Sequence, residues 1–470
     1  MFTGPPELVP GPIHSFWPPF PRPEGALLLA MQWQFEQGER LAPELLRQRV
    51  SRQLAVLVRF AFKEVPYYRE RYVREGWRWD RLPRRVEDWS SLPILSREGL
   101  LQAGTAMIAG RRPAGHDRGH PMKSSGSTGQ PVVVQRNNVK DLVWQAITLR
   151  EHLWHRRDFS GKMATIRKMD HPDLGRPPHG SLLSNWGAPV AHVFRGGPMA
   201  VLDIATASIA QQREWLLREN PDYLLTYPTN AHALAREFID LGLRLPRLRQ
   251  VRTLSETLTG ETRKLCREAW DVAIVDTYSA NEVGYIALQC PDHERYHVQA
   301  ENVWVEIVDS QGAPCVPGTV GRVIVTDLNN FSSPLLRYDT GDWAIPSDPC
   351  PCGRGLPTLE RIMGRSRNML VLPSGERRWP MMRPSLYREI LPLKQIQMVQ
   401  HTPVRLEVRL VVDQPPGPAA EDRLRQAIVQ TLGYGFDIEF QYRKELIRSQ
   451  RGKFEEFVSL VEESAFKPGT

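Results

Sequence analysis

The sequence predicts an α/β protein with a large N-terminal domain of mixed α/β structure and a small α+β C-terminal domain. In the middle of the chain, short apolar segments alternate with stretches whose apolar residues recur at helical spacing, which is typical of βα units. The predicted strands here are 224–226, 250–254 and 273–276, and the predicted helices are 209–219, 230–241 and 261–269. After Glu282 the pattern changes to short strands, such as 303–308 and 321–326, which indicates a β-rich subdomain over residues 287–356.

The length and composition of the chain support two domains. It has 470 residues, of which 41% are hydrophobic and 24% are charged, so it is globular and too long for one compact domain. Beyond Gly364, strand-like and helical segments follow one another over about a hundred residues, which is the size of a small domain. We place the boundary at Ser366, which gives domains of residues 1–366 and 367–470.

Prolines dominate the first 25 residues, which excludes a helix there and suggests an extended arm. Apolar residues at helical spacing then predict two or three helices between Ala26 and Glu75 and a further helix from Asn138 to Trp154. Ser96 can cap another helix. No apolar run is long enough for a membrane span, so we expect a soluble, cytoplasmic protein.

The net charge of +8 is scattered along the chain. A nucleic-acid-binding protein would concentrate its positive charge on one element with interleaved aromatic residues, which this sequence does not do. We therefore expect small anionic ligands as partners, and neither nucleic acid nor a membrane. The five cysteines are an odd number in a chain without a secretion signal, so a disulfide framework is not expected. The sequence leaves the oligomeric state open, a homodimer included.

A loop rich in glycine and hydroxyl residues is the first candidate site. Residues 123–131 read Lys-Ser-Ser-Gly-Ser-Thr-Gly-Gln-Pro, and the apolar run 132–134 follows. Glycines let backbone N–H groups converge on an anion, and Ser and Thr hydroxyls add donors, which suits phosphate. No Gly-Lys-Ser/Thr closes the loop, so it is not a Walker motif, and an ordinary turn is the alternative. The candidate phosphate ligands are Ser124, Ser125, Gly126, Ser127, Thr128 and Gly129.

Cysteines and histidines form a second candidate site. Cys290 lies shortly before His293 and His297, and a Cys-Pro-Cys motif follows at Cys350 and Cys352. Two thiolates one residue apart, with a distant cysteine and a histidine, can complete a tetrahedral zinc site. We expect a structural zinc ion on Cys290, His297, Cys350 and Cys352, because four protein ligands leave no open position. The alternative is that the cysteines only decorate a proline turn.

With four further motifs in the same order and spacing, the phosphate loop resembles the adenylate-forming enzymes, which include acyl-CoA synthetases and peptide-synthetase adenylation domains. The motifs are Asp276-Thr277-Tyr278-Ser279-Ala280-Asn281-Glu282, Tyr338-Asp339-Thr340-Gly341-Asp342, Gly364-Arg365 and Arg451-Gly452-Lys453. Within this superfamily the chain is most similar to the phenylacetate-CoA ligase branch. The resemblance runs from about Leu54 to Lys453 and so covers most of the chain.

The resemblance implies a role for each motif. Tyr278 would lie on the adenine of ATP, with an adenine-side loop beside it, and Glu282 would meet magnesium. Asp342 would accept hydrogen bonds from the ribose hydroxyls, and Arg365 would contact ribose or phosphate. Lys453, from a mobile C-terminal domain, would neutralise negative charge on the carboxylate and the α-phosphate. The implied site comprises Thr128, Glu282 and Lys453 as catalytic residues and Ser255, Glu256, Thr257, Asp276, Thr277, Tyr278, Asp342 and Arg365 around the nucleotide.

Several positions depart from the family's pattern. Asn281 replaces the usual threonine before the glutamate, and Asp339 replaces the usual arginine of the Tyr-Arg-Thr-Gly-Asp motif. The hinge, which in relatives is usually Asp-Asp or begins with Lys, is Arg367-Asn368. Residues 372–376 replace a glycine-led segment of many CoA-using relatives. Adenylation is therefore better supported than transfer to CoA.

The sequence thus predicts an enzyme that uses ATP and magnesium to convert a small, aromatic carboxylic acid into an acyl-adenylate, with CoA as the acceptor. The alternatives are an amine or a carrier-protein thiol as acceptor, or nitrite as the activated acid. A non-catalytic nucleotide-binding protein is a further alternative, but the presence of Glu282, Asp342 and Lys453 together argues against it.

Two details of ligand binding follow from position relative to the motifs. The walls of the acid pocket are expected at Trp186-Gly187 and at residues 227–229, with burial in the core as the alternative. The cations that would attract CoA are Arg365, Arg367, Arg377 and Arg378.

Overall fold

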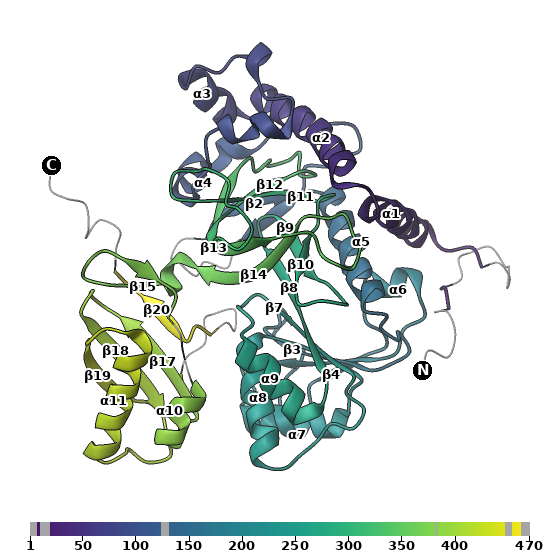
Figure 1. Cartoon of the computed structure of the whole chain (residues 1–470). Coiled ribbons are helices and arrows are strands. Elements are labelled where there is room, and N and C mark those ends of the chain that lie inside the picture. The colour runs from purple at the N-terminus through teal and green to yellow at the C-terminus, as the bar shows by residue number, and fades with distance from the viewer. Residues whose placement is uncertain are drawn as a thin grey trace. The chain divides into compact units, whose positions relative to one another are not determined.

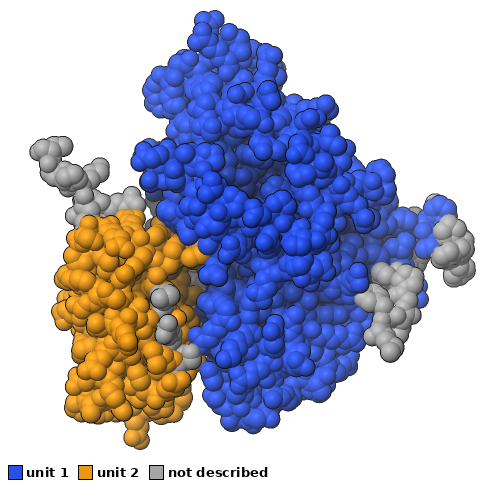
Figure 2. Space-filling view, viewed as in Figure 1, with its two compact units in different colours: residues 1–362 blue, residues 363–470 orange. Residues whose placement is uncertain are grey.

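The computed structural model describes residues 7–9, 19–123, 131–380, 382, 384–446 and 454–461. The chain divides into two compact units, residues 1–362 and 363–470 (Figure 2). Each unit has hydrophobic clusters of its own. The domain boundary expected at Ser366 lies just after this division, in the 3-10 turn η4 (Ser366–Asn368).

A twelve-stranded sheet forms the framework of the first unit (Figure 1). Its strands are β3 (Met163–Arg167), β4 (Ser181–Leu183), β5 (Met199–Asp203), β6 (Tyr223–Thr226), β7 (Gln250–Leu254), β8 (Ala273–Ala280), β9 (Gly284–Gln289), β10 (Tyr296–Val298), β11 (Val303–Val308), β12 (Gly321–Asp327), β13 (Tyr338–Ser347) and β14 (Thr358–Arg365). Their order across the sheet is β11-β12-β13-β14-β10-β9-β8-β7-β6-β3-β5-β4. From β8 to β5 neighbouring strands are parallel, whereas β9 and β4 are antiparallel to their neighbours in this part.

Helices cover both faces of the parallel part. The helices of this unit are α1 (Pro23–Glu39), α2 (Pro43–Glu64), α3 (Pro66–Arg74), α4 (Arg97–Ala103), α5 (Asn138–Trp154), α6 (Val190–Val193), α7 (Ile209–Glu219), α8 (Pro228–Asp240) and α9 (Gly260–Trp270), with 3-10 turns η1 (Trp79–Arg81), η2 (Val86–Ser91) and η3 (Gly104–Met107). Trp215 of α7 and Phe238 of α8 pack with Ala164 of β3 on one face. The neighbouring Met163 points to the other face, where it packs with α1, α5 and α6. Successive side chains along a strand point to opposite faces of the sheet, so the two cores lie on opposite faces.

The N-terminal helices α2 to α4 belong to a third core with strands β9 to β14. In α2 the buried residues Leu54, Leu57, Val58 and Ala61 recur at helical spacing, as the sequence predicts. Between α4 and α5, a separate two-stranded sheet is formed by β1 (His120–Lys123) and β2 (Val133–Arg136).

The second unit is a small α+β fold. Its elements are β15 (Leu370–Val371), β16 (Arg377–Arg378), α10 (Pro384–Ile390), β17 (Gln395–Gln400), β18 (Arg405–Val411), α11 (Pro418–Leu432), β19 (Asp437–Tyr442) and β20 (Phe457–Ser459). A four-stranded sheet has the order β19-β18-β17-β20, and β20 runs parallel to β17. Leu406, Val408 and Leu410 of β18 point to α10 and α11, which cover one face of this sheet.

The mixed α/β architecture agrees with the predicted fold class, with two differences. Helix α1 begins at Pro23, inside the stretch expected to be extended, because proline lacks only an N–H that the first turn of a helix does not use. The strands expected to form a separate β-rich subdomain instead continue the large sheet from β8. Within the described part of the chain, no helix combines the length and apolar character that a membrane span requires.

Candidate active site and metal cluster

The motif of residues 276–282 lies at the end of β8. This strand pairs in parallel with β7 and antiparallel with β9, and a bulge interrupts the second pairing between Tyr278 and Ser279. The chain then turns back through Asn281 and Glu282 directly into β9. The motif therefore occupies the point where the sheet changes from parallel to antiparallel. In open α/β sheets, ligands bind outside the carboxyl ends of parallel strands.

The residues expected to bind adenine and ribose are in contact. Tyr278 Oη donates a hydrogen bond to Asp342 Oδ2 at 2.8 Å, and both residues are more than nine-tenths buried. Asp342 lies on β13 directly after Gly341, whose φ of +73° is in the left-handed region that favours glycine. The aromatic ring of Tyr278 and the carboxylate of Asp342 thus lie side by side. This arrangement suits a nucleoside, because its base and its ribose are covalently joined.

The expected magnesium ligand, Glu282, is paired with an arginine. Glu282 Oε1 lies 3.7 Å from Arg97 Nη1, and the Glu282 side chain is 8% exposed. Arg97 begins α4, and the preceding Leu95 exchanges backbone hydrogen bonds with β13. Arg97 is not among the site residues that the sequence motifs predict, because the sequence around it indicates only a helix capped by Ser96.

Asp276 and Thr277 differ in the hydrogen bonds of their side chains. The Asp276 carboxylate accepts hydrogen bonds from Thr253 Oγ1 at 2.7 Å and from Tyr296 Oη at 2.9 Å. Burial raises the pKa of Asp276, and these hydrogen bonds oppose the shift. Thr277 Oγ1 is buried without a hydrogen-bond partner among the described residues. Asp276 on β8 is therefore bonded to β7 and to β10, and holds these strands of the sheet together.

The loop at residues 255–257 is tied to the start of α8. Glu256 Oε2 accepts hydrogen bonds from Thr229 N at 3.1 Å and from Thr229 Oγ1 at 2.7 Å. A carboxylate at a helix N-terminus satisfies a free N–H and interacts favourably with the helix dipole. Ser255 has a φ of +71°, which is unusual outside glycine and marks a sharp turn after β7. The expected adenine-side glutamate thus caps a helix.

The phosphate loop and the expected catalytic lysine lie outside the described residues. These are Ser124, Ser125, Gly126, Ser127, Thr128 and Gly129 in the loop, and Lys453 in the second unit. One end of the loop can be placed, because Asn281 Nδ2 donates a hydrogen bond to the carbonyl oxygen of Lys123 at 3.2 Å. The chain therefore enters the loop beside the residue that precedes Glu282.

The remaining expected site residues lie in three places. Arg365 ends β14, and its N–H donates to Asn368 Oδ1 at 3.3 Å within the second unit. Trp186 is buried in the core with Phe159, and its Nε1 donates to the carbonyl oxygen of Gly161 at 2.9 Å. Tyr227 is also buried. These two aromatic residues are part of the hydrophobic cores of the first unit.

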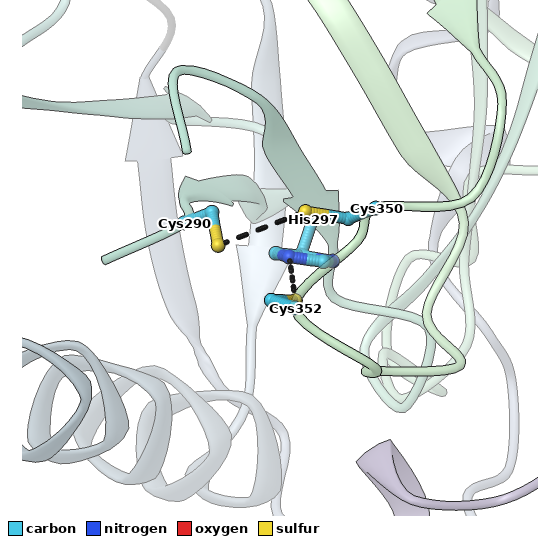
Figure 3. Close-up of side chains that lie close together, drawn as sticks. All are labelled: Cys290, His297, Cys350 and Cys352. Carbon is cyan, nitrogen blue, oxygen red and sulfur yellow. Dashed lines mark hydrogen bonds between the residues drawn. The ribbon is translucent and has the colours of Figure 1, made fainter. Parts of the chain in front are cut away.

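Four side chains converge in the metal cluster, which we define as Cys290, His297, Cys350 and Cys352 (Figure 3). Their ligand atoms all lie within 4.8 Å of one another. Cys290 Sγ is 3.8 Å from Cys350 Sγ, and His297 Nε2 is 3.3 Å from Cys352 Sγ. The cluster forms because β10, which carries His297, pairs with both β9 and β14. His293 is not among the converging groups.

The electrostatic environment favours the metal-binding forms of two of the four cluster residues, His297 and Cys352. Burial raises the pKa of Cys290 to about 12 and also raises that of Cys350, which favours the thiol at both positions. Burial lowers the pKa of His297 to about 4, and nearby Arg354 and Arg150 act in the same direction, so the imidazole is neutral at physiological pH. Burial favours the thiol of Cys352, but hydrogen bonds involving Arg354 outweigh it and lower the pKa of that thiol. A neutral imidazole and a thiolate are the forms that bind metals.

The loop of the metal cluster is attached to the N-terminal helix. Gly355 N donates to the carbonyl oxygen of Glu39 at 2.8 Å, and Arg354 Nε lies 3.4 Å from Glu39 Oε1 at the end of α1. The Arg354 guanidinium also lies over the ring of Trp154, 4.6 Å from its centroid, at the end of α5. The turn that follows Cys352 is thus attached to the ends of α1 and α5.

Comparison with known proteins identifies the superfamily. No protein-family model matches the chain. A phenylacetate-coenzyme A ligase of Thermus thermophilus is 26% identical over 350 residues, which cover 71% of this chain and 73% of that protein. A phenylacetate-coenzyme A ligase of Pseudomonas putida is 24% identical over 349 residues, covering 71% and 74%. Over these lengths the chain is similar to adenylate-forming CoA ligases, as its motifs predict.

Solved structures of this superfamily share the fold of the new ligase. A 2-hydroxyisobutyryl-CoA ligase in the postadenylation state superposes with a TM-score of 0.69 at 17% identity and covers 92% of each chain. An anthranilate CoA ligase in complex with anthranoyl-AMP gives a TM-score of 0.50 at 18% identity, covering 71% of this chain and 65% of that one. The predicted fold class and the predicted superfamily are confirmed.

The capping role of Glu256 gives a prediction for the ligase. Glu256→Ala should lower the free energy of unfolding by about 1 kcal/mol, because it removes the acceptor and the charge at the start of α8. Glu256→Gln should cost less, since an amide oxygen can still accept from Thr229. Chemical denaturation measures both, with the exposed Glu268 changed to Ala as the matched control. A loss for Glu256→Ala no larger than that of the control would contradict the capping role.

Proposed function

We propose that this ligase uses ATP and magnesium to adenylate a small, aromatic carboxylic acid, releases pyrophosphate and then transfers the acyl group to CoA. The observation that carries the proposal is the hydrogen bond between Tyr278 on β8 and Asp342 on β13, with Glu282 in the turn that follows β8. Groups suited to a base, to a ribose and to a divalent cation are thus adjacent, at the sheet edge where such ligands bind.

The proposed chemistry has two steps. First, a carboxylate oxygen of the acid attacks the α-phosphorus of ATP, the bond from that phosphorus to the bridging oxygen breaks, and pyrophosphate leaves. Negative charge builds on the oxygens around the α-phosphorus, and we assign Lys453 to this charge. Glu282 would hold magnesium, which when bound supplies charge neutralisation to the phosphates. Second, the CoA thiolate attacks the acyl carbon, and AMP leaves.

The names of the relatives favour an aromatic acid. Both sequence relatives described above are named for phenylacetate, and the anthranilate CoA ligase is named for an aromatic acid as well. The 2-hydroxyisobutyryl-CoA ligase is named for an aliphatic acid and has the higher TM-score, 0.69 against 0.50. At 17% and 18% identity, the likeness to these two solved structures concerns the fold alone. The assignment to aromatic acids therefore rests on the sequence relatives.

CoA as acceptor is supported by the relatives more than by charges in the second unit. Two of the four arginines expected to attract CoA are engaged within that unit. The Arg378 guanidinium donates to the carbonyl oxygen of Leu432 at the end of α11, and the Arg367 guanidinium donates to Glu455. An amine or a carrier-protein thiol remains the alternative acceptor, and nitrite the alternative acid.

Product analysis tests this proposal. The protein is incubated with ATP, magnesium and panels of aromatic acids, aliphatic acids and nitrite, each with CoA, with an amine or without acceptor. Pyrophosphate release and mass spectrometry report the two steps. We expect acyl-AMP and then acyl-CoA from an aromatic acid. An acyl-adenylate that persists with CoA but is consumed by an amine would contradict the assigned acceptor. If no acid in the panels causes pyrophosphate release, the proposed adenylation is wrong.

Replacement of Lys453 tests the assigned catalytic residue. Lys453→Ala should reduce the turnover number of acyl-adenylate formation by about a hundredfold to a thousandfold, because one contact to developing charge is lost. ATP binding, measured by calorimetry, should change little, since the lysine acts on the transition state. Lys444→Ala, at an exposed lysine of the same unit, is the matched control. Unchanged pyrophosphate release in Lys453→Ala would remove this lysine from the site.

We also propose that the metal cluster holds a structural zinc ion. Two thiolates on a tetrahedral zinc ion lie about 3.8 Å apart, and a thiolate and an imidazole nitrogen about 3.5 Å apart. The corresponding distances are 3.8 Å for Cys290 and Cys350 and 3.3 Å for His297 and Cys352. With four protein donors the tetrahedron is complete, so no position is open for a substrate.

Metal analysis of the purified protein tests the zinc proposal. We expect about one zinc ion per chain, and Cys352→Ser should lower both the zinc content and the melting temperature, because metal binding is coupled to folding. Cys315→Ser is the matched control, because Cys315 lies outside the cluster. Full stability of Cys352→Ser, or wild-type protein without zinc after purification free of chelators, would contradict a structural zinc ion.

A further inference from the structure

The segment that follows Lys453 is bonded to the expected hinge of the second unit. Glu455, two residues after Lys453, accepts hydrogen bonds at Oε1 from the guanidinium of Arg367, with Nε at 3.1 Å. The side chains are 21% and 28% exposed for Arg367 and Glu455, so solvent screens the pair only in part. Arg367 lies in η4, which we call the hinge turn (Ser366–Asn368).

Hydrogen bonds to backbone carbonyl oxygens hold the same segment on two sides. Asn368 Nδ2 of the hinge turn donates to the carbonyl oxygen of Phe457 at 2.7 Å. On the other side, Gln397 Nε2 donates to the carbonyl oxygen of Glu455 at 2.9 Å, and Met398 N donates to that of Glu456 at 2.8 Å. The Arg367–Glu455 ion pair is therefore the charged part of an attachment between the hinge turn, β17 and the segment of residues 455–457.

The residue types at the two ends of this ion pair depend on each other. The resemblance to adenylate-forming enzymes implies an aspartate or a lysine at the position of Arg367, and a carboxylate there would repel Glu455 at this distance. An arginine can donate two N–H groups to one carboxylate, which makes a stronger and more directional bond than a lysine can make. The departure of this chain from the usual hinge is thus matched by an acid beside the expected catalytic lysine.

We propose that the Arg367–Glu455 ion pair is a positioning device that fixes the segment directly after Lys453 to the hinge turn, so that delivery of the lysine amino group depends on it. This inference rests on the proposed adenylation. A lysine has a flexible four-carbon side chain, and it stabilises developing charge only if its backbone is placed correctly. The ion pair does not touch the substrate, so it acts through Lys453. Loss of the ion pair in Glu455→Gln, which retains Arg367, should slow adenylation and leave thioester formation from a preformed acyl-adenylate unchanged.

Charge removal and charge exchange test the proposal in the full-length protein. The variants are Glu455→Gln, Arg367→Gln and the exchange Arg367→Glu with Glu455→Arg. Glu439→Gln is the matched control, because Glu439 pairs with Arg405 on the sheet of the same unit at 2.7 Å. Three quantities are measured for each variant: the rate of acyl-adenylate formation, the rate of acyl-CoA formation from synthetic acyl-adenylate, and amide hydrogen exchange in residues 454–461.

The expected results separate positioning from a loss of folding. Glu455→Gln should lower the turnover number for adenylation by roughly ten- to a hundredfold, the cost of a small misplacement of a catalytic group, with an unchanged KM for ATP. Hydrogen exchange in residues 454–461 should become faster, and the exchange variant should recover most of both losses. In a Lys453→Ala background, Glu455→Gln should have no further effect on adenylation, because the pair acts through the lysine.

Three outcomes would overturn the inference in distinguishable ways. If the wild-type protein forms no acyl-adenylate with any acid, the proposed function fails and this inference fails with it. If the wild type is active and Glu455→Gln matches Glu439→Gln in adenylation rate and in hydrogen exchange, the positioning role alone is wrong. A loss in Glu455→Gln that the charge-exchange variant does not recover would likewise contradict an ion-pair mechanism.

Discussion

Hydrogen bonding of β8 to a parallel neighbour on one side and to an antiparallel neighbour on the other sets the geometry of the first unit. Parallel pairing with β7 requires a crossover, which α9 provides, whereas antiparallel pairing with β9 needs only a short turn. That turn carries Asn281 and Glu282, and β13 brings Asp342 to Tyr278. Tyr278 and Asp342 are therefore held by the sheet itself, and Glu282 lies in the turn that follows β8.

Two smaller attachments serve different parts of the molecule. The turn after the metal cluster is fastened to Glu39 at the end of α1 through Arg354 and Gly355. In the second unit, the hinge turn is attached to the segment after Lys453 through Arg367 and Glu455. The first attachment stabilises the framework. We propose that the second positions the Lys453 amino group, whose positive charge the adenylation step needs.

Local patterns predicted the elements well and the long-range contacts poorly. Apolar periodicity gave α7 and β7 their observed bounds, because both are buried on a regular face. The start of α1 at Pro23 was missed, since proline-rich sequence hides a helix that tolerates proline in its first turn. The motifs placed Tyr278, Asp342 and the four metal-cluster residues in candidate sites. Contacts such as Arg97 with Glu282 depend on how distant elements pack, and sequence spacing carries no signal for them.

Oxygen transfer tests the central claim, adenylation of a carboxylic acid, most directly. An aromatic acid labelled with ¹⁸O in its carboxylate is incubated with the protein, ATP, magnesium and CoA, and the AMP is analysed by mass spectrometry. If a carboxylate oxygen attacks the α-phosphorus and the acyl carbon is then attacked by the thiolate, one labelled oxygen leaves with AMP. The account predicts AMP with one ¹⁸O atom. Turnover that yields unlabelled AMP, or label in inorganic phosphate together with ADP, would contradict it.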